Sequence, residues 1–325
     1  MKNIIIVTIF IMFCITVATF FFEMHPELTT PGMNQPIEEH EAKESEPLQT
    51  SPLLPIYEDD SIGYSLQNDQ LQITLNKGRD WILVPVEKEK LFAGEYNGNE
   101  QELIGNSYIL TKNRAAFLYS EGNSIKLKYS LNHGETWEDS VVTAQYPPIR
   151  FRKVEFLNEK FGYVIISGDR TMSQEWTTVY ITNDGGKHWK ETTHSNVTRL
   201  IYDGGFVGEN TGFLSFGILN PVEPDLYITQ DSGNSWSKAN ITIPEKYHEI
   251  FVMAEVPFKE EDHLAVYINQ GPNGDYEGGK IKGKFISNDN GNTWEFSMEV
   301  LPNESNKRKI GVWLFFLMPF VSYES

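Results

Sequence analysis

The chain has 325 residues, of which 27 are basic and 45 acidic, giving a formal net charge of −18 at neutral pH. A charge of this sign and size repels nucleic acid and anionic lipid headgroups, so it argues against both as partners and suits a basic partner. The single cysteine excludes a disulfide framework and a cysteine metal site, so a folded domain must be held by its apolar core.

The N-terminus carries an apolar stretch, residues 4–22, with no charge between Lys2 and Glu23. About 19 apolar residues suffice for a helix that crosses a bilayer. Because Lys2 precedes this stretch and acidic residues follow it, we expect the rest of the chain on the extracytoplasmic side. The sequence thus predicts residues 1–23 as the anchor of a single-pass cell-membrane protein. Two alternatives stay open: a signal peptide whose cleavage secretes the domain, and a lipoprotein attached at Cys14, which the bulky Phe13 disfavours.

Residues 24–56 form a segment of different composition. They are rich in Pro, Glu, Ser and Thr and contain few aromatic side chains. Such a segment cannot bury enough apolar surface to offset the entropy lost on folding. We therefore expect a disordered linker between the anchor and a folded domain that begins at residue 57.

A motif then occurs five times and organises the folded part of the chain. Its pattern is Ser or Thr, any residue, Asp or Asn, any residue, Gly, two further residues, and Trp. Ordinary residue frequencies give one match at roughly one position in 10^5, so five matches indicate an internal repeat. The defined positions of the five copies are Thr74, Asn76, Gly78, Trp81; Ser130, Asn132, Gly134, Trp137; Thr182, Asp184, Gly186, Trp189; Thr229, Asp231, Gly233, Trp236; and Ser287, Asp289, Gly291, Trp294.

Each copy predicts a hairpin turn between two strands. An apolar residue stands directly before every copy, and another stands three positions before it in four of the five, with Lys284 as the exception. This alternation is typical of a half-buried strand. The Asp, Asn, Ser and Thr side chains can accept hydrogen bonds from the amides of the turn, and Gly supplies a positive φ. The Trp begins the return strand and can cover the hairpin.

The spacing of the motif predicts the architecture. The copies start at residues 74, 130, 182, 229 and 287, so they lie 47 to 58 residues apart. A four-stranded propeller blade takes ~40–50 residues. Short β-rich runs fill the intervals, and no helical period is sustained in them. We therefore expect an all-β fold over residues 57–325, a β-propeller of four-stranded blades. Five blades are expected, or six if the long interval after Trp236 contains a blade whose motif has decayed.

The two ends of this domain are expected to meet. Only two strands, residues 61–66 and 70–75, are predicted before the first motif, so the first blade is one strand short. The apolar run at residues 310–320 is too short to span a membrane, and we expect it to supply the missing strand. Closure of this kind removes exposed strand edges.

The motif resembles the Asp box, or BNR repeat, of the sialidase-like superfamily of β-propellers, which includes sortilin-type receptors and propellers of the photosystem II assembly factor type. The resemblance covers residues 56–325. It implies that each box lies at the hairpin between the third and fourth strands of a blade, on the rim away from the central funnel, and that its role is structural.

Sialidase chemistry is not expected. It requires three arginines that converge on a carboxylate, a Tyr activated by a Glu, and an Asp acid. The Arg-Ile-Pro opening that the resemblance implies before the first box is absent, and Pro148-Ile149-Arg150 has the reverse order. Arg150 and Arg152 alternate with Phe151, which a solvated strand face also explains. We therefore expect no catalytic residues.

Metal and cofactor sites are not expected either. His188 and His194 are six residues apart across a turn, and the turn position explains His188. The run at residues 288–292 resembles part of an EF-hand loop but lacks the Glu at its end. A phosphate-binding glycine loop and a Gly-x-Ser-x-Gly motif are absent from the sequence.

These observations favour a non-catalytic, membrane-anchored propeller that binds a protein or peptide through its loops. The Gly-rich segment 268–279 is the best contact candidate, and residues 146–148 and 219–224 form similar loops. The alternative is a glycan-binding propeller or an active sialidase-like glycoside hydrolase. Aromatic side chains flanked by amides in the funnel would favour glycan binding, and converging arginines beside a Tyr–Glu pair would favour the hydrolase.

Overall fold

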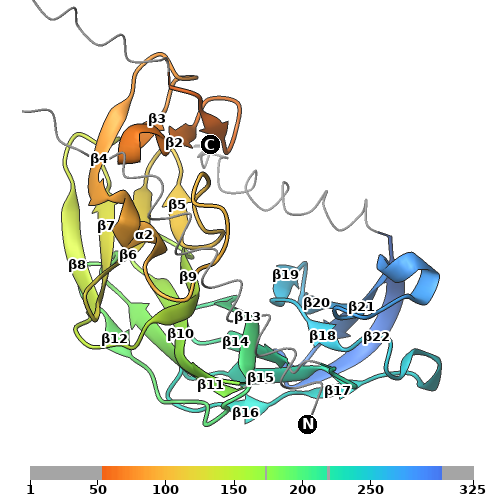
Figure 1. The fold of residues 1–325 in the computed structure, drawn as a ribbon. Coiled ribbons are helices and arrows are strands. Elements are labelled where there is room, and N and C mark those ends of the chain that lie inside the picture. The colour runs from red at the N-terminus through yellow and green to blue at the C-terminus, as the bar shows by residue number, and fades with distance from the viewer. Residues whose placement is uncertain (1–52, 173, 218–219, 302–325) are drawn as a thin grey trace, which may run out of the picture. The chain divides into compact units, whose positions relative to one another are not determined.

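The computed structural model describes residues 53–172, 174–217 and 220–301, which belong to one of the two units of the chain, Pro52–Ser325. The described chain is almost entirely β-structure arranged in antiparallel sheets, mostly of four strands, as the sequence predicted (Figure 1). The predicted anchor, most of the linker and the closing strand at 310–320 lie outside the described residues. Within the described part, no helix is both long enough and apolar enough to cross a membrane.

Five sheets follow one another along the described chain. The first contains β1 (Ile56–Tyr57), β2 (Gly63–Ser65), β3 (Gln70–Thr74) and β4 (Ile82–Glu87). The second contains β5 (Tyr108–Leu110), β6 (Ala115–Glu121), β7 (Ser124–Ser130) and β8 (Glu138–Thr143). The third contains β9 (Ile149–Phe156), β10 (Gly162–Thr171), β11 (Gln174–Thr182) and β12 (Lys190–Glu191). The fourth contains β13 (Leu200–Phe206), β14 (Gly212–Gly217), β15 (Asp225–Thr229) and β16 (Ser237–Lys238). The fifth contains β17 (Asn240–Thr242), β18 (Met253–Ala254), β19 (Phe258–Glu260), β20 (His263–Asn269), β21 (Lys282–Ser287) and β22 (Thr293–Val300).

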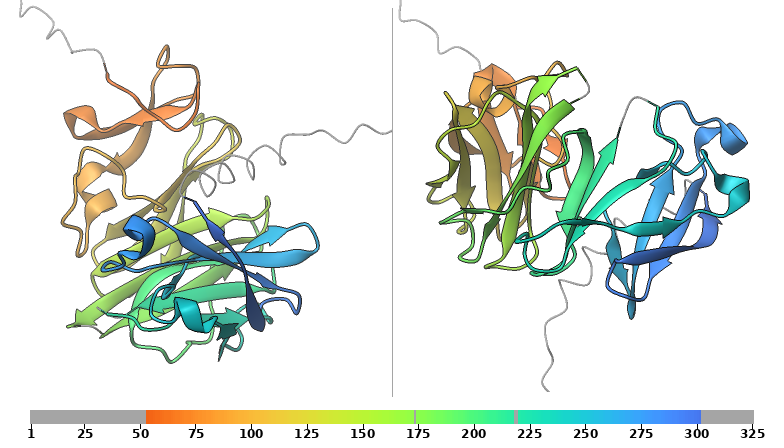
Figure 2. Two further views of the ribbon diagram at one scale, coloured as in Figure 1. Left: turned by 90° about the vertical axis from the view of Figure 1, so that its right-hand side faces the viewer. Right: turned by 90° about the horizontal axis from the view of Figure 1, so that it is seen from below.

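Each sheet packs against the next one in the chain (Figures 1 and 2). Contacts between β5 and β9, between β10 and β13, and between β14 and β18 join successive sheets. The apolar core is correspondingly divided into four clusters, each built mainly from two neighbouring sheets. On β7, Ile125, Leu127 and Tyr129 alternate toward one such cluster, as period-two strands require. Burying one side chain of this kind contributes about 1.5–3 kcal/mol, so the stacking of sheets is the main source of stability.

The first sheet corrects one expectation. It was predicted to lack a strand, but Ile56 and Tyr57 pair with Tyr64 and Gly63 and complete the four strands from the segment directly before it. A two-residue strand leaves no periodic signal in the sequence, which is why it was assigned to the linker.

The long interval between the fourth and fifth boxes is explained within the described residues without a further sheet. Its extra length forms β17, the helical turn η2 (Glu245–Tyr247) and a first strand divided into β18 and β19. β17 runs parallel to β22, with Asn240 opposite Thr293. This parallel strand adds an outer layer of pairing to the fifth sheet.

Helices are short and lie in the connections. The expectation of intervals without helix is wrong for α2 (Lys88–Phe92), which follows β4 and buries Leu91 and Phe92. Five residues are too few for a helical period to show in the sequence. The other helical turns are η1 (Gln67–Asp69) and η3 (Tyr276–Gly279).

Candidate functional site

The five motif copies share one hydrogen-bond arrangement, which begins at the first residue. In each copy the Ser or Thr hydroxyl accepts a hydrogen bond from the Gly amide four residues later, at 2.8 to 3.0 Å. The same hydroxyl donates to the Asp or Asn side chain two residues later, at 2.8 to 3.2 Å. All five hydroxyl-bearing residues are buried, so these bonds satisfy polar groups that water does not reach.

The Asp or Asn side chain completes each turn. Its Oδ1 atom accepts a hydrogen bond from the amide four residues later, at 2.8 to 3.0 Å in every copy. In the third copy, the amide and side chain of His188 and the hydroxyl of Thr182 lower the pKa of Asp184 to about 2. His188 is thereby engaged in the turn, through Nδ1 at 2.6 Å from Asp184.

In four of the five boxes the Trp packs in an apolar cluster shared with another sheet: Trp137, Trp189, Trp236 and Trp294. Trp294 is fully buried, and its ring meets Phe213 of the fourth sheet with centroids 6.0 Å apart. Trp236 donates from Nε1 to the carbonyl of Thr193 at 2.9 Å, and Trp189 donates to Ser140 at 3.1 Å. The boxes therefore link successive sheets.

The boxes occupy one end of the sheets. Each lies between the third and fourth strands of its sheet: β3 and β4, β7 and β8, β11 and β12, β15 and β16, and β21 and β22. In an antiparallel sheet, the turn between the second and third strands lies at the opposite end. The loop between β20 and β21 and the loop between β14 and β15 therefore lie away from the boxes.

Lys284, the exception in the apolar pattern before the boxes, has a structural explanation. It lies on β21, and its ammonium group pairs with the carboxylate of Glu260 on β19. His263 also contacts Glu260, at 3.3 Å. The additional strand β19 thus supplies the charge that balances a lysine at an otherwise apolar position.

Arg150 and Arg152 do not form a solvated face, contrary to the expectation. Arg150 makes a two-pronged ion pair with Glu175, whose side chain is fully buried, and also donates to the carbonyl of Ile201 at 2.8 Å. Arg152 is 3% exposed and donates to the carbonyls of Leu91 and Ala93 at 2.9 and 2.7 Å. Burial lowers the pKa of Arg152 to about 10. Both arginines therefore hold elements together.

The described arginines do not share a partner. Arg199 pairs with Asp225, and Arg170 lies 3.7 Å from Glu95. Arg114 donates to backbone carbonyls beside the third box and lies over the ring of Phe156. Tyr–Glu contacts occur at several places among the described residues. In one of them, Tyr163 with Glu155, the Tyr is buried, and burial raises its pKa well above the ordinary range. The arginine cluster of a sialidase is therefore not assembled among the described residues.

The part of the chain that the structure describes holds no group of three or more His, Cys, Asp or Glu side chains that could bind a metal ion. His194 lies against Glu191 at 3.2 Å and against the ring of Trp176. These two contacts explain the position of His194 without a bound metal ion.

A cleft with a volume of about 530 Å³ lies between the first and second sheets. One wall is the edge strand β4 with Lys90 of α2, and the other is one face of β6, β7 and β8. We name it the inter-sheet cleft. Its lining residues are Asp69, Gln70, Leu83, Val84, Pro85, Val86, Glu87, Lys90, Tyr119, Glu121, Lys126, Lys128 and Asp139.

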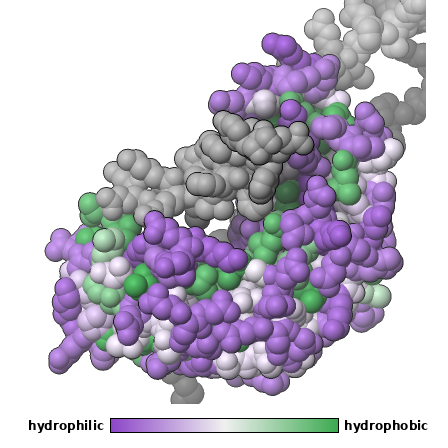
Figure 3. All heavy atoms as spheres, turned by 180° about the vertical axis from the view of Figure 1, so that it is seen from behind, coloured by the Kyte–Doolittle hydropathy of each residue, from purple (hydrophilic) through white to green (hydrophobic). Residues whose placement is uncertain are grey.

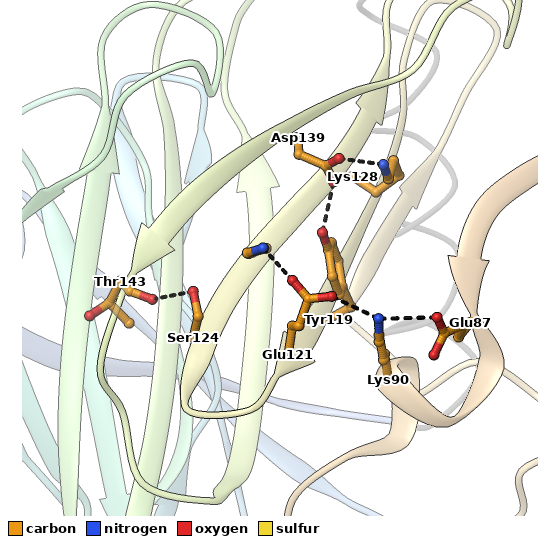
Figure 4. Close-up of polar contacts among 9 residues, drawn as sticks. Glu87, Lys90, Tyr119, Glu121, Ser124, Lys128, Asp139 and Thr143 are labelled. Carbon is orange, nitrogen blue, oxygen red and sulfur yellow. Dashed lines mark hydrogen bonds and ion pairs between the residues drawn. The ribbon is translucent and has the colours of Figure 1, made fainter.

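Two groups of ion pairs line the inter-sheet cleft (Figure 4). In the first, Glu121 accepts hydrogen bonds from Lys90, at 2.7 Å, and from Lys126. Lys90 also contacts Glu87, at 3.2 Å. In the second group, Asp139 accepts hydrogen bonds from Lys128 and from the hydroxyl of Tyr119, the latter at 2.8 Å.

Strand register explains why these groups face the same space. Tyr119 stands opposite Lys126, and Lys128 stands opposite Asp139, so alternate residues of three strands point to one side. The hydrogen bonds from Lys126 and Lys90 lower the pKa of Glu121 to about 2, so Glu121 is ionised at neutral pH. Burial, followed by the bond to Asp139, raises the pKa of Tyr119, which therefore stays a hydroxyl donor.

The inter-sheet cleft was not predicted from the sequence. Its charged residues come from four strands and two short helices, and each one alone has the pattern of a solvated surface residue. The available signal was the pair Lys126 and Lys128 beside the apolar Ile125 and Leu127, which marks one charged and one apolar face.

A second hollow lies where residues 220–221 and 270–276, from two of the predicted contact loops, meet. The loop pocket has a volume of about 170 Å³, and Asn273 donates to Asn220 across it at 2.9 Å. Tyr146, from the third predicted loop, is instead buried and donates to the carbonyl of Ile166. The loop pocket is lined by Asn220, Pro221, Glu249, Ile250, Gln270, Pro272, Asn273, Gly274, Asp275 and Tyr276.

No known protein family and no curated protein matches the sequence. Among solved structures, the GH74 xyloglucanase from Xanthomonas campestris is 13% identical, with 70% of this chain and 34% of that chain covered and a TM-score of 0.39. The GH43_1 enzyme from Xanthomonas citri is 9% identical over 65% and 75%, with a TM-score of 0.37. The NanB sialidase from Streptococcus pneumoniae is 13% identical over 62% and 32%, with a TM-score of 0.35.

These comparisons contradict the expectation of a protein without catalytic activity, because the similar structures are glycoside hydrolases, among them β-xylosidases and an endo-arabinase. At TM-scores below 0.5 the likeness transfers no site residue to this chain, so the function has to be argued from its own side chains.

Proposed function

We propose that the protein recognises neutral glycans and that the inter-sheet cleft holds the sugar. The observation that carries this proposal is the arrangement of ammonium and carboxylate groups around a cleft of about 530 Å³. That volume lies within the ~300–1,000 Å³ of typical small-ligand sites.

The hydrogen-bonding capacity of the cleft suits hydroxyl groups. A lysine carries three N–H donors, and within the described residues Lys126 and Lys128 each use one of them on a carboxylate. The carboxylates of Glu121 and Asp139 retain acceptor capacity beyond their present partners. A sugar hydroxyl both donates and accepts, so one hydroxyl can bridge a lysine and a carboxylate.

The charge balance of the cleft favours an uncharged ligand. Its lining contains four acidic and three basic side chains, so the two signs nearly cancel. Since each lysine is already paired with a carboxylate, a sialic or uronic acid gains little attraction from a lining that has one more acidic than basic side chain. Leu83, which is 51% exposed, and the partly buried Val86 add apolar surface for the carbon face of a sugar ring.

We extend the proposal to the architecture of the chain and to the location of the folded domain. We infer that the five described sheets are the blades of a propeller whose boxes are structural. We also keep the proposal that residues 1–23 hold the domain on the extracytoplasmic side of a membrane, where glycans are accessible. The face seen in Figure 3 is mostly hydrophilic, with apolar side chains in small separate areas, which suits exposure to solvent.

Isothermal titration of the full chain with neutral cello-, xylo- and malto-oligosaccharides, beside sialyllactose, tests the proposal. We expect one neutral series to bind and sialyllactose not to bind. Lys128→Met should weaken binding roughly ten- to a hundred-fold, because a hydrogen bond from a charged group contributes about 1.5–3 kcal/mol. Lys187→Met, at an exposed position in the third box, is the matched control and should bind like the unchanged chain.

Ionic strength separates this account from simple charge attraction. Binding of a neutral sugar should change little between low and physiological salt, whereas a charged ligand would lose affinity as salt screens it. Each titration should also be assayed for newly formed reducing ends, since the similar solved structures are hydrolases. If the Lys128→Met chain bound the sugar as tightly as the unchanged chain, the inter-sheet cleft would not be the sugar-binding site.

A further inference from the structure

The loop pocket differs from the inter-sheet cleft in its chemistry. Its ionisable lining consists of Glu249, Asp275 and Tyr276, and no lysine or arginine is among its described lining residues. Glu249 and Asp275 are both exposed to solvent. A ligand in this pocket therefore meets negative charge that no neighbouring base within the lining offsets.

Amides supply the remaining polar surface of the loop pocket. Asn220 and Asn273 face each other across it, joined by the 2.9 Å hydrogen bond. Gln270 is 5% exposed, and its Nε2 donates to the carbonyls of Tyr276 and Ile281, both at 2.9 Å. Its Oε1 atom is buried and has no hydrogen-bond partner among the described residues. An unsatisfied buried acceptor in a pocket wall calls for a donor.

The walls are held in place before any ligand arrives. Tyr276 donates to Glu299 of β22 at 3.0 Å, and Tyr247 donates to the same carboxylate. The rings of Tyr247 and Phe251 pack with centroids 4.8 Å apart. The side of the pocket that Tyr276 forms is therefore fixed to the fifth sheet, so a ligand loses little affinity in ordering it.

We propose that the loop pocket binds a protonated amino sugar, such as a glucosamine unit of a glycan. Glu249 and Asp275 receive the ammonium group, and the amides of Asn220 and Asn273 bond the hydroxyls. Tyr276 and Pro221 offer flat surfaces to the ring. This site is separate from the inter-sheet cleft and does not depend on what the cleft binds.

The pH dependence of such binding has a definite sign. An amine of this kind has a pKa of about 8, as α-amino groups do, and only its protonated form is attracted by carboxylates. Affinity should be full below that value and fall as the pH rises through it. The hydrogen bond to Glu299, followed by desolvation, raises the pKa of Tyr276, so Tyr276 stays neutral over this range. Other charged groups around the pocket are Glu277, which follows Tyr276, Glu299, and His248, which precedes Glu249. Lys246 lies over the ring of Tyr247.

The experiment is a titration of the full chain with a glucosamine trimer, its N-acetylated counterpart and cellotriose, at physiological salt. A His248→Gln background removes the neighbouring imidazole from the pH comparison. At pH 7 we expect the glucosamine trimer to bind at least tenfold more tightly than the other two sugars, and at pH 9.5 we expect this preference to vanish. Glu249→Gln and Asp275→Asn should each abolish the preference without changing the thermal transition, because both side chains are exposed.

Two controls keep the proposal open to refutation. Lys128→Met in the inter-sheet cleft should retain the amine preference, which shows that the two sites are distinct. Glu209→Gln, an exposed acid elsewhere, should also retain it. Equal binding of the three trimers, or a preference that survives in both Glu249→Gln and Asp275→Asn, would overturn the proposal. If trilysine bound as tightly as the glucosamine trimer, the binding would be only a general attraction between a cation and an acidic protein, and the proposal of an amino-sugar site would be wrong.

Discussion

Removal of one buried hydroxyl tests the structural role of the boxes. Thr229 is 1% exposed, and its Oγ1 accepts from the amide of Gly233 at 2.8 Å while donating to Asp231 at 2.8 Å. Thr229→Val keeps the shape of the side chain and replaces the hydroxyl by a methyl group. The amide of Gly233, which is also buried, then loses its partner and cannot turn to water.

The size of the effect follows from that orphaned amide. A buried donor left unsatisfied costs about 1–3 kcal/mol. For a domain of roughly 150–250 residues, each kcal/mol lowers Tm by about 2–4 °C. We therefore expect Thr229→Val to lower the free energy of unfolding by about 2 kcal/mol and Tm by roughly 4–8 °C, as measured by calorimetry on the full chain.

The same substitution at an exposed box position is the matched control. Thr293 of the fifth box donates to Asp289 at 2.7 Å, but its side chain is solvated, so water replaces the lost bond. Thr293→Val should lower Tm by less than about 2 °C, consistent with exposed substitutions. Equal Tm shifts for the two variants would refute the claim that burial makes the box hydroxyl structural.

Three further outcomes follow from the geometry. Arg150→Met leaves the fully buried carboxylate of Glu175 without its partner and should cost about 3–5 kcal/mol in chemical denaturation, whereas the double change with Glu175→Met should recover most of it. Gly291→Ala places a Cβ 2.5 Å from Phe213 and should lower Tm clearly more than Gly122→Ala, where φ is also positive but the space is open. The pKa of Glu121 is lowered to about 2, so its ion pairs are fully formed above its ordinary pKa and are lost as the pH falls from about 4.5 toward 2. The affinity for a neutral sugar should therefore stay constant between pH 5 and 8 and fall only in strong acid. A loss of affinity already between pH 7 and 5 would contradict this.

Local structure was the part of this molecule that the sequence predicted well. The Ser/Thr-x-Asp/Asn-x-Gly pattern specifies its own turn, because every bond it makes lies within five residues. The strands that enter the boxes are likewise marked by alternating apolar residues, and four-stranded antiparallel sheets followed from the interval between boxes.

Contacts between segments distant in sequence were not predictable in the same way. The strand β1 has two residues and forms only because β2 offers its edge. Arg152 has the local pattern of a solvated residue, and its burial depends on the carbonyls that end α2, about 60 residues earlier. The inter-sheet cleft exists because charged faces of two sheets meet there without filling the space, which is a property of packing.

The most direct test of the central claim is a crystal structure of the full chain with the tightest neutral oligosaccharide from the titration. The account predicts the sugar between β4 and the face of β6–β8, with hydroxyl groups within hydrogen-bond distance of Lys126, Lys128 and Glu121. A sugar bound elsewhere on the molecule at saturating concentration, with the cleft holding only water, would contradict it.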